Sequence, residues 1–374
     1  MRVAIVHDYL AQMGGAEKVV EVLHEMFPEA PVYTSVYVPE AMPASFKSWD
    51  IRTSFLQRLP ALKKTHRFAL PLYPLAFESF DLRGYDLVIS SSSAFAKGVI
   101  TQPHTVHICY THTPMRFGWM THSYLEREEI GGLERVLLEP VLYRLRLWDV
   151  VAALRIDRYV ANSTVVAQRI ARFYRRECDI VYPPVDTNRF KPSAQKEDYY
   201  LVAARFAPYK RLDLAIEACN RLKRPLKVVG SGRQEAYLRR IAGPTVEFLG
   251  RVSDAELVQL MAHARGYIMP GQEDFGISPV EANACGCPVI AYAAGGALDT
   301  QVDGVTGVLF PEQSVESLCE ALCRAESLAF DIHVMRQHAQ RFDTSVFKER
   351  MRQIIEEEMA KQHKVVSGER RQNV

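Results

Sequence analysis

Short runs of β-branched and aliphatic residues alternate with amphipathic helical stretches along most of this chain of 374 residues. The first run, residues 2–9, leads into a stretch at 15–27 whose apolar side chains recur at helical spacing. Comparable runs follow at residues 85–92, 106–113 and 157–163, the last before a helix predicted to start near Thr164. Alternation of this kind is typical of a parallel sheet with helices on both faces. In such sheets ligands bind beyond the carboxyl ends of the strands.

The alternation is interrupted once and then resumes. Residues 183–198 carry three prolines and many polar side chains, so this segment is predicted to be a linker. Residues 1–182 then form one doubly wound domain, and residues 199–344 form a second. Helices are predicted at Leu212–Leu222, at Asp254–Ala264 and after Ser278. A final helix is predicted from about Thr344, within residues 345–374.

Length and composition agree with an ordinary two-domain protein. A chain of 374 residues is too long for one ordinary core. The net charge of +2 gives no reason to expect a nucleic-acid partner. No apolar run is long enough to span a bilayer, and the first residues run straight into a strand rather than a secretion signal. The seven cysteines have no metal-ligand spacing. The expected location is therefore the cytoplasm, including the inner face of the cell membrane.

One segment holds two glutamates eight positions apart, Glu273 and Glu281. The pattern predicts a helix capped by Ser278, with Pro279 at its first position and Glu281 three residues after the cap, which is a capping box. Capping accounts for Glu281, whereas Glu273 lies in the loop with no helix to cap. The loop glycine Gly276 would present backbone N–H groups at a helix N-terminus, which suits phosphate. The two glutamates would then accept hydrogen bonds from sugar hydroxyls.

A second cluster follows the first strand of the second domain. Arg205 and Lys210 flank a short loop there, and together they could neutralise a diphosphate leaving group. The alternative is a solvated basic loop. The chain holds no Asp-x-Asp pair, so no metal is expected, and these cations would have to do what a metal does elsewhere.

Three positions in the first domain lie where strands end. Gly14 and Gly15 stand between a strand and a helix, either as a tight turn or as a close approach of backbone to phosphate. His112 follows a strand in the segment "CYTHTPMRFGW". It is either a core histidine or one that faces a ligand, and its place beside Pro, Arg and Trp favours the ligand.

The segment "VVGSGRQE" contains Gly232 but counts against a dehydrogenase. Glu235 stands where a dinucleotide-binding fingerprint has its third glycine.

Residues 135–176 form a basic and apolar patch. Nine arginines stand there against three acids, with aliphatic and aromatic residues between them. The patch is either a set of buried helices with solvated basic faces or a surface that rests on anionic lipid.

Taken together, these segments resemble the retaining glycosyltransferases of GT-B architecture, family 4. The most specific element is "EDFGISPVE" followed by "ANACGCPVIAYAAGG". Supporting elements are "GGAEK", "ANSTVVAQRI", "YPPVDTNRFKP", "RFAPYKRLD", "VVGSG" and "FLGRVSDAEL". The segment "YTHTPMRFGW" resembles bacterial mannosyltransferases that build O-antigen and exopolysaccharide. The resemblance covers nearly the whole chain. It implies an α/β fold with two Rossmann-like, doubly wound domains facing across a cleft, and a C-terminal helix that crosses back to the N-terminal domain.

The resemblance also implies roles for individual residues. Catalysis would involve Glu273, Arg205, Lys210 and His112, with Glu273 on the donor sugar, His112 facing that sugar, and the two cations on the diphosphate. Glu281 would hold the ribose, and Arg251 and Val252 would lie beside the base. The remaining donor-binding residues would be Gly14, Gly15, Gly232, Asp274, Phe275, Gly276, Ile277 and Ser278. Asp274 departs from the common pattern of Gly or Ser, so it would either alter donor choice or face solvent.

The implied reaction is transfer of a hexose with retention, without a metal or other cofactor. GDP-mannose is the favoured donor. The acceptor is expected to be a glycan or a polyprenyl-diphosphate-linked saccharide, in bacterial surface polysaccharide synthesis. Three alternatives stay open at this point: a UDP-sugar-dependent transferase of the same fold, a sugar-nucleotide 2-epimerase, and a non-catalytic binding subunit.

Overall fold

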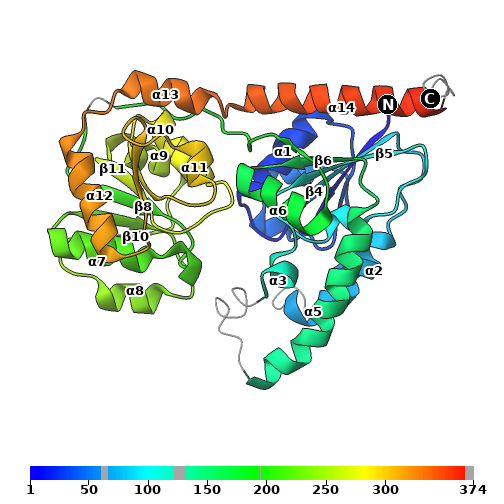
Figure 1. Cartoon of the computed structure of the whole chain (residues 1–374), viewed down its shortest axis with the longest axis horizontal. Helices are drawn as coiled ribbons and strands as arrows, with labels where there is room; N and C mark the ends of the chain where they lie inside the picture. The colour runs from blue at the N-terminus through cyan, green and yellow to red at the C-terminus, as the bar shows by residue number, and fades with distance from the viewer. Residues whose placement is uncertain (60–65, 122–131, 194, 367–374) are drawn as a thin grey trace. The chain divides into compact units, whose positions relative to one another are not determined.

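The computed structural model of the chain describes residues 1–59, 66–121, 132–193 and 195–366. The chain divides into two compact units, here called unit 1 (Met1–Pro184 with Phe347–Val374) and unit 2 (Val185–Val346). Each is an α/β unit built on a parallel sheet (Figure 1). Most of the predicted linker belongs to unit 2. The backbone N–H of Val185 donates to the carbonyl of Phe342 (3.0 Å), and that of Glu197 donates to the carbonyl of His263 (2.8 Å).

Unit 1 is built on seven parallel strands in the order β3-β2-β1-β4-β5-β6-β7. The chain order reverses between β1 and β4, and such a switch point is where doubly wound sheets bind ligands. The strands are β1 (Val3–His7), β2 (Val32–Thr34), β3 (Ile51–Thr53), β4 (Leu87–Ser92), β5 (Val106–Thr111), β6 (Arg158–Ala161) and β7 (Asp179–Ile180).

Successive strand residues point to opposite faces of this sheet. Because residues on both faces are buried, helices cover both. Ile5 packs in the core beneath α1 and α14, whereas its neighbour Val6 packs in the core beneath α2 and α5. The helix α14 contributes Phe347 and Met351 to the first core, so the C-terminal helix packs on unit 1 as predicted. The helices are α1 (Gly15–Met26), α2 (Tyr73–Glu78), α3 (Arg116–Trp119), α5 (Gly132–Ala153), α6 (Thr164–Tyr174) and α14 (Thr344–Val366).

Unit 2 has six parallel strands in the order β10-β9-β8-β11-β12-β13, with its switch point between β8 and β11. The strands are β8 (Tyr200–Ala203), β9 (Leu226–Val229), β10 (Val246–Gly250), β11 (Gly266–Met269), β12 (Val289–Tyr292) and β13 (Gly307–Phe310). The helices are α7 (Leu212–Leu222), α8 (Glu235–Ile241), α9 (Asp254–His263), α10 (Ile277–Ala284), α11 (Ala297–Thr300), α12 (Val315–Ser327) and α13 (Ile332–Gln340).

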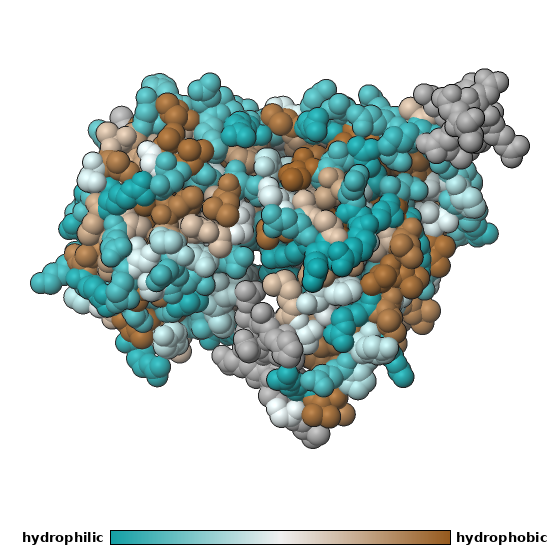
Figure 2. All heavy atoms as spheres, viewed as in Figure 1, coloured by the Kyte–Doolittle hydropathy of each residue, from teal (hydrophilic) through white to brown (hydrophobic). Residues whose placement is uncertain are grey.

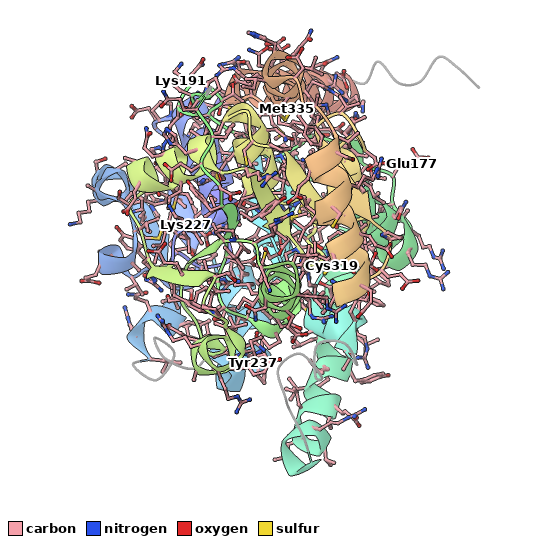
Figure 3. All side chains as sticks on the ribbon, turned by 90° about the vertical axis from the view of Figure 1, so that its left-hand side faces the viewer. Glu177, Lys191, Lys227, Tyr237, Cys319 and Met335 are labelled. Atoms are coloured by element: carbon pink, nitrogen blue, oxygen red, sulfur yellow. The ribbon has the colours of Figure 1, made fainter. Side chains whose placement is uncertain are left out.

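The helices α7, α8 and α12 share one core of unit 2 with residues from most of its strands. Figure 3 faces this unit, and Tyr237 on α8, Cys319 on α12 and Met335 on α13 mark three of its helices. Cys319 is buried in that core, whereas Tyr237 is exposed. The predicted bounds of α7 agree with the structure, and α9 ends one residue earlier than predicted. None of the helices in the described residues combines the length and apolar character that a bilayer crossing requires.

Candidate functional site

The switch point of unit 2 brings two predicted site residues into contact. β8 and β11 are neighbours in the sheet, so the loops that follow them leave the same edge side by side. The loop after β8 ends in a short 3-10 helix, Pro208–Lys210, and the loop after β11 carries Glu273. The Lys210 Nζ lies 2.5 Å from the Glu273 Oε1. Both side chains are mostly buried, at 22% and 18% exposed, so this ion pair is held by the fold rather than formed in open solvent.

Glycines allow the surrounding loops to approach Glu273 closely. A Cβ on Gly271 would lie 2.6 Å from the carbonyl oxygen of Tyr209, inside van der Waals contact. On the other side, the N–H of Gly296 donates to the carbonyl of Glu273 (2.9 Å), and a Cβ on Gly295 would lie 2.2 Å from that same oxygen. The loop after β12 therefore fixes the backbone of Glu273, and the loop after β8 packs two residues earlier, against Gly271.

The helix α10 starts two residues earlier than the predicted capping box places it, and the capping box is wrong. Gly276 is the N-cap, with φ at +86°, and no side chain caps the helix. This left-handed conformation suits glycine, and it turns the chain before Ser278 can act as a cap. Burial raises the pKa of Tyr267, and the nearby Ser278 side chain acts in the opposite direction. Glu281 lies further into the helix, where it is 5% exposed, so capping no longer explains it.

Two more predicted cations lie at the same edge of the unit 2 sheet. Arg205 is exposed, and its Nη2 donates to the hydroxyl of Tyr209 (3.1 Å). Arg251 follows β10 and donates from Nε to the Ser231 Oγ (2.9 Å). Since all these strands are parallel, Arg205, Lys210 and Arg251 all follow strand carboxyl ends. Positive charge is thus gathered at the carboxyl edge of the unit 2 sheet.

The other residues of unit 2 that were predicted to contact the donor differ in how buried they are and in what they pack against. Gly232 packs against Phe206, whose carbonyl oxygen would be 2.6 Å from a Cβ on the glycine, so backbone packing accounts for this residue. Phe275 is buried, and its ring lies 5.7 Å from that of Phe342. Asp274, Ile277 and Val252 are partly buried. Their contacts with a donor stay predictions.

At the switch point of unit 1, a carboxylate already occupies the natural anion position. Asp8 follows β1, and its two side-chain oxygens accept hydrogen bonds from four consecutive backbone N–H groups after β4. The donors are Ser93 (2.5 Å), Ala94 (3.1 Å), Phe95 (2.7 Å) and Ala96 (2.7 Å). Sequence reasoning missed Asp8, although its place at a strand end was a usable signal.

The predicted residues of unit 1 lie near a buried polar cluster. His112 follows β5 and is 8% exposed, and its Nε2 lies 2.8 Å from the Ser91 Oγ. Gly14 is the N-cap of α1 and has an extended backbone that any residue adopts. A Cβ there would lie 3.0 Å from the Glu17 Oε2. Gly15 begins α1 and is exposed.

Sequence reasoning also missed the buried pair of His7 and Glu17, whose Nε2 and Oε1 are 3.6 Å apart.

In the predicted basic patch at 135–176, fewer arginines are available to a partner than the composition suggests. Many of its arginines donate hydrogen bonds within unit 1, among them Arg146, Arg155, Arg158, Arg169 and Arg176. The exposed face of α5 is instead largely apolar. Within the described parts of the chain, no group of three or more His, Cys, Asp or Glu residues could hold a metal ion.

Curated relatives match part of the chain. A GDP-mannose-dependent monoacylated alpha-(1-6)-phosphatidylinositol monomannoside mannosyltransferase of Corynebacterium glutamicum is 38% identical over 135 residues. That match covers 32% of this chain and 35% of the relative. A D-inositol 3-phosphate glycosyltransferase of Saccharomonospora viridis is 30% identical over 244 residues, covering 54% of this chain and 56% of the relative. The chain therefore matches only about a third to a half of the length of these relatives.

Solved structures match almost the whole fold. Sucrose-phosphate synthase from Thermosynechococcus elongatus superposes with a TM-score of 0.74 at 18% identity, over 96% of this chain and 100% of that chain. Anabaena HepE in complex with UDP-glucose gives a TM-score of 0.70 at 19% identity, with the same coverage. These similarities show the fold.

Two family models match adjoining parts of the sequence. Residues 13–189 match Glycosyltransferase Family 4, and residues 185–342 match Glycosyl transferases group 1. Between them the models cover residues 13–342, which include the loops that carry Lys210 and Glu273. With two doubly wound units and the matches to both models, the chain belongs to the GT-B glycosyltransferases of family 4.

Proposed function

We propose that this protein transfers a hexose from a nucleotide diphosphate sugar to a glycan hydroxyl, with retention of the anomeric configuration. The observation that carries the proposal is the Lys210–Glu273 ion pair at the switch point of unit 2. The cation, which lies close to a helix N-terminus, suits the diphosphate of such a donor, and the carboxylate suits its sugar. The diphosphate is an anion, and the sugar is a set of hydroxyl donors.

Each residue has a role that its chemistry permits. Lys210, together with the exposed Arg205, neutralises the diphosphate as the bond to the sugar breaks. Glu273 accepts hydrogen bonds from sugar hydroxyls. The backbone N–H of Ile277 at the start of α10 adds a donor for phosphate or sugar. With this positive charge supplied by side chains, the reaction is proposed to need no metal.

Retention is proposed to follow from a displacement on one face of the sugar. In this step the bond between the sugar C1 and the phosphate oxygen breaks, and a bond from C1 to the acceptor oxygen forms on the same face. The departing phosphate oxygen takes the proton of the acceptor hydroxyl. Glu273 is engaged by Lys210, which supports a binding role for its carboxylate rather than a role as nucleophile.

Mannose from GDP-mannose is the proposed donor. Support comes from the Corynebacterium glutamicum relative, which is named as GDP-mannose-dependent, and from the likeness of "YTHTPMRFGW" to bacterial mannosyltransferases. A UDP-hexose is the main alternative, since HepE was solved with UDP-glucose.

A calorimetric donor screen tests the assignment. GDP-mannose, UDP-glucose, UDP-GlcNAc and UDP-galactose would each be titrated into the full chain. Lys210→Ala is expected to weaken donor binding by 10- to 100-fold, since a close charged contact to phosphate contributes about 1.5–3 kcal/mol. Glu273→Ala is expected to abolish transfer. Lys227→Ala is the matched control, because Lys227 lies on β9 in a separate pair with Glu197.

The outcomes separate the candidates. Near-normal transfer in Glu273→Ala would refute the site. Tight binding of a UDP-sugar but not of GDP-mannose would identify the UDP-sugar as the donor and leave the proposed reaction unchanged. Conversion of the donor with no acceptor present would identify an epimerase. EDTA is expected to leave the rate unchanged.

The acceptor is proposed to be lipid-linked, with α5 as the surface that meets the bilayer. Its outward side chains include Leu137, Tyr143, Leu147 and Val151, all between 53% and 67% exposed. Tyr143, Leu147 and Val151 recur at intervals of four residues, so they form one stripe along the helix. Figure 2 shows hydrophobic side chains over α2 and again near the N-terminal end of α5. Exposed Arg144 adds positive charge beside the stripe, which suits anionic lipid.

Sedimentation with vesicles tests this proposal. The protein is expected to pellet with vesicles of anionic phospholipid, and Leu147→Glu with Val151→Glu should abolish pelleting because charge on the stripe opposes insertion. Arg172→Glu on α6 controls for loss of positive charge alone. If the double variant dimerises less than the wild type and neither protein binds vesicles, the stripe is a protein interface and the proposal is wrong.

A further inference from the structure

A chain of polar contacts runs through the unit 1 switch point. It begins at Glu17 on α1, passes through His7 at the end of β1 and Ser91 in β4, and ends at His112 after β5. All four side chains are buried, with exposures of 4%, 2%, 0% and 8% in that order. Buried polar groups of this kind must each find a partner, and this requirement fixes where their hydrogens lie.

The hydrogens of His7 follow from its two neighbours. Its Nδ1 lies 3.0 Å from the Ser91 carbonyl oxygen, which can only accept, so Nδ1 carries a hydrogen. Its Nε2 faces the Glu17 carboxylate at 3.6 Å. Burial lowers the pKa of His7, but Glu17, Asp8 and the Ser91 carbonyl together outweigh burial, and the net pKa is raised. The Nδ1 of His7 therefore donates a hydrogen bond, and the raised pKa favours the imidazolium form, in which Nε2 also carries a hydrogen.

The hydroxyl of Ser91 lies between His7 and His112 and contacts a ring nitrogen of each. Its Oγ is 3.2 Å from the His7 Nδ1, which has a hydrogen to give, and 2.8 Å from the His112 Nε2. Since the Nδ1 of His7 donates, the hydroxyl oxygen is the acceptor in that contact, and its own single hydrogen is available for the Nε2 of His112. The Nε2 of His112 then accepts, which places the ring hydrogen of His112 on Nδ1.

We propose that Glu17, His7 and Ser91 act as positioning residues that fix His112 in its Nδ1–H tautomer. For catalysis the inference rests on the proposed function and on the role that the family resemblance implies for His112. With Nε2 committed to Ser91, His112 can donate a hydrogen bond to a ligand through Nδ1 but not through Nε2. Tautomer selection by a buried partner is a general way to orient a working histidine.

The protein itself reports the tautomer by nitrogen-15 NMR. In the full chain labelled at histidine, the proton-coupled spectrum of His112 is expected to show a protonated Nδ1 and an unprotonated Nε2. His7 is expected to show both nitrogens protonated. Assignments come from His7→Gln and His112→Gln. A wild-type spectrum with the hydrogen of His112 on Nε2 would overturn the proposal without any variant.

Neighbouring serines on β4 supply a matched pair of variants. Ser91→Ala should release His112 into a mixture of tautomers, and Ser91→Thr should restore the Nδ1–H form. Ser90→Ala is the control, because the Ser90 Oγ contacts the Nε2 of a different histidine, His107, at 2.8 Å. It should change the His107 signals and leave those of His112 as they are. If a folded Ser91→Ala keeps the wild-type His112 spectrum, the contact with Ser91 does not set the tautomer of His112.

Activity provides the second readout. With the active donor, Ser91→Ala should lower kcat about tenfold, as loss of one oriented hydrogen bond would, with a smaller change in KM. Ser90→Ala should not. An altered tautomer with an unchanged kcat would overturn the positioning role. If the wild type transfers no hexose, the proposed function fails, while the NMR result still decides the tautomer.

Discussion

His107 in β5 is a fully buried histidine with a strongly perturbed titration. Burial, with a smaller contribution from the charge of Arg155, lowers the pKa of His107 to about 3. The unfolded chain therefore binds a proton between pH 6.5 and pH 3 that the native chain does not. The stabilising contribution of His107 is complete above pH 6.5 and is lost as the pH falls toward 3.

We expect unfolding measured with urea at pH 7, 6, 5 and 4 to show this dependence. Replacing His107 by Gln should flatten the decline by up to about 1.4 kcal/mol per pH unit. His7 gives a contrast in sign, because its raised pKa supplies stability that is present below pH 6.5 and lost as the pH rises above it. An equal slope in wild type and His107→Gln would contradict the assignment.

Single residues also mark how far sequence reasoning reaches. Arg205, Lys210 and Glu273 were predicted because charged side chains follow strand-like runs. The ion pair itself was not predicted, since Lys210 and Glu273 are far apart in sequence and meet only because β8 and β11 pair. The capping box failed because the turn belongs to Gly276, whose positive φ no local pattern reveals.

The loop between β12 and α11 holds Glu273 from one side, so its glycine is open to a test. Gly295→Ala combines a positive φ of 63° with a Cβ only 2.2 Å from the Glu273 carbonyl oxygen. Gly304→Ala has a φ of 75°, but its Cβ would meet only the Arg324 Nη2, at 3.7 Å. Both variants carry the backbone strain, and only the first carries the clash.

We expect Gly304→Ala to lose about 1 kcal/mol of stability and Gly295→Ala to lose 2 kcal/mol or more, as steric overlap is added to backbone strain. Donor affinity should fall in Gly295→Ala alone. Urea unfolding and calorimetry measure the two quantities. Equal effects of the two variants on both would show that the loop does not hold Glu273.

Elements of different length were predictable to different degrees. Long amphipathic segments such as α1, α6 and α7 appeared near their predicted bounds. The strands β2, β3 and β7 have only two or three residues each, too few to show an alternation of apolar and polar side chains. The apolar outer face of α5 was partly masked by its arginines, and only burial separates the two sets.

At the scale of the whole molecule, unit 1 depends on a distant piece of the chain. The helix α14 follows all of unit 2 in sequence and places Phe347, Met351, Ile354 and Ile355 in the core of unit 1. Each such side chain contributes about 1.5–3 kcal/mol on burial, so together they match the stability of a typical domain. Unit 1 is therefore complete only when the entire chain has been made.

We expect truncation after Asp343 to unfold unit 1 while unit 2 keeps its protection. Hydrogen exchange followed by mass spectrometry would compare peptides from β1 and β4 with peptides from β8 and β11. Truncation after Val366 is the control and should leave both sets protected. Retained protection of β1 and β4 in the shorter chain would show that α14 is dispensable.

The carboxylate of Asp8 has a consequence for stoichiometry. Two sheets of the same design could in principle each cradle an anion at the switch point. In unit 1 the four backbone N–H groups that would do so already bind Asp8. A saturating nucleotide diphosphate should therefore fill one place per chain rather than two, and an inhibitor that mimics the diphosphate would have a single target on this protein.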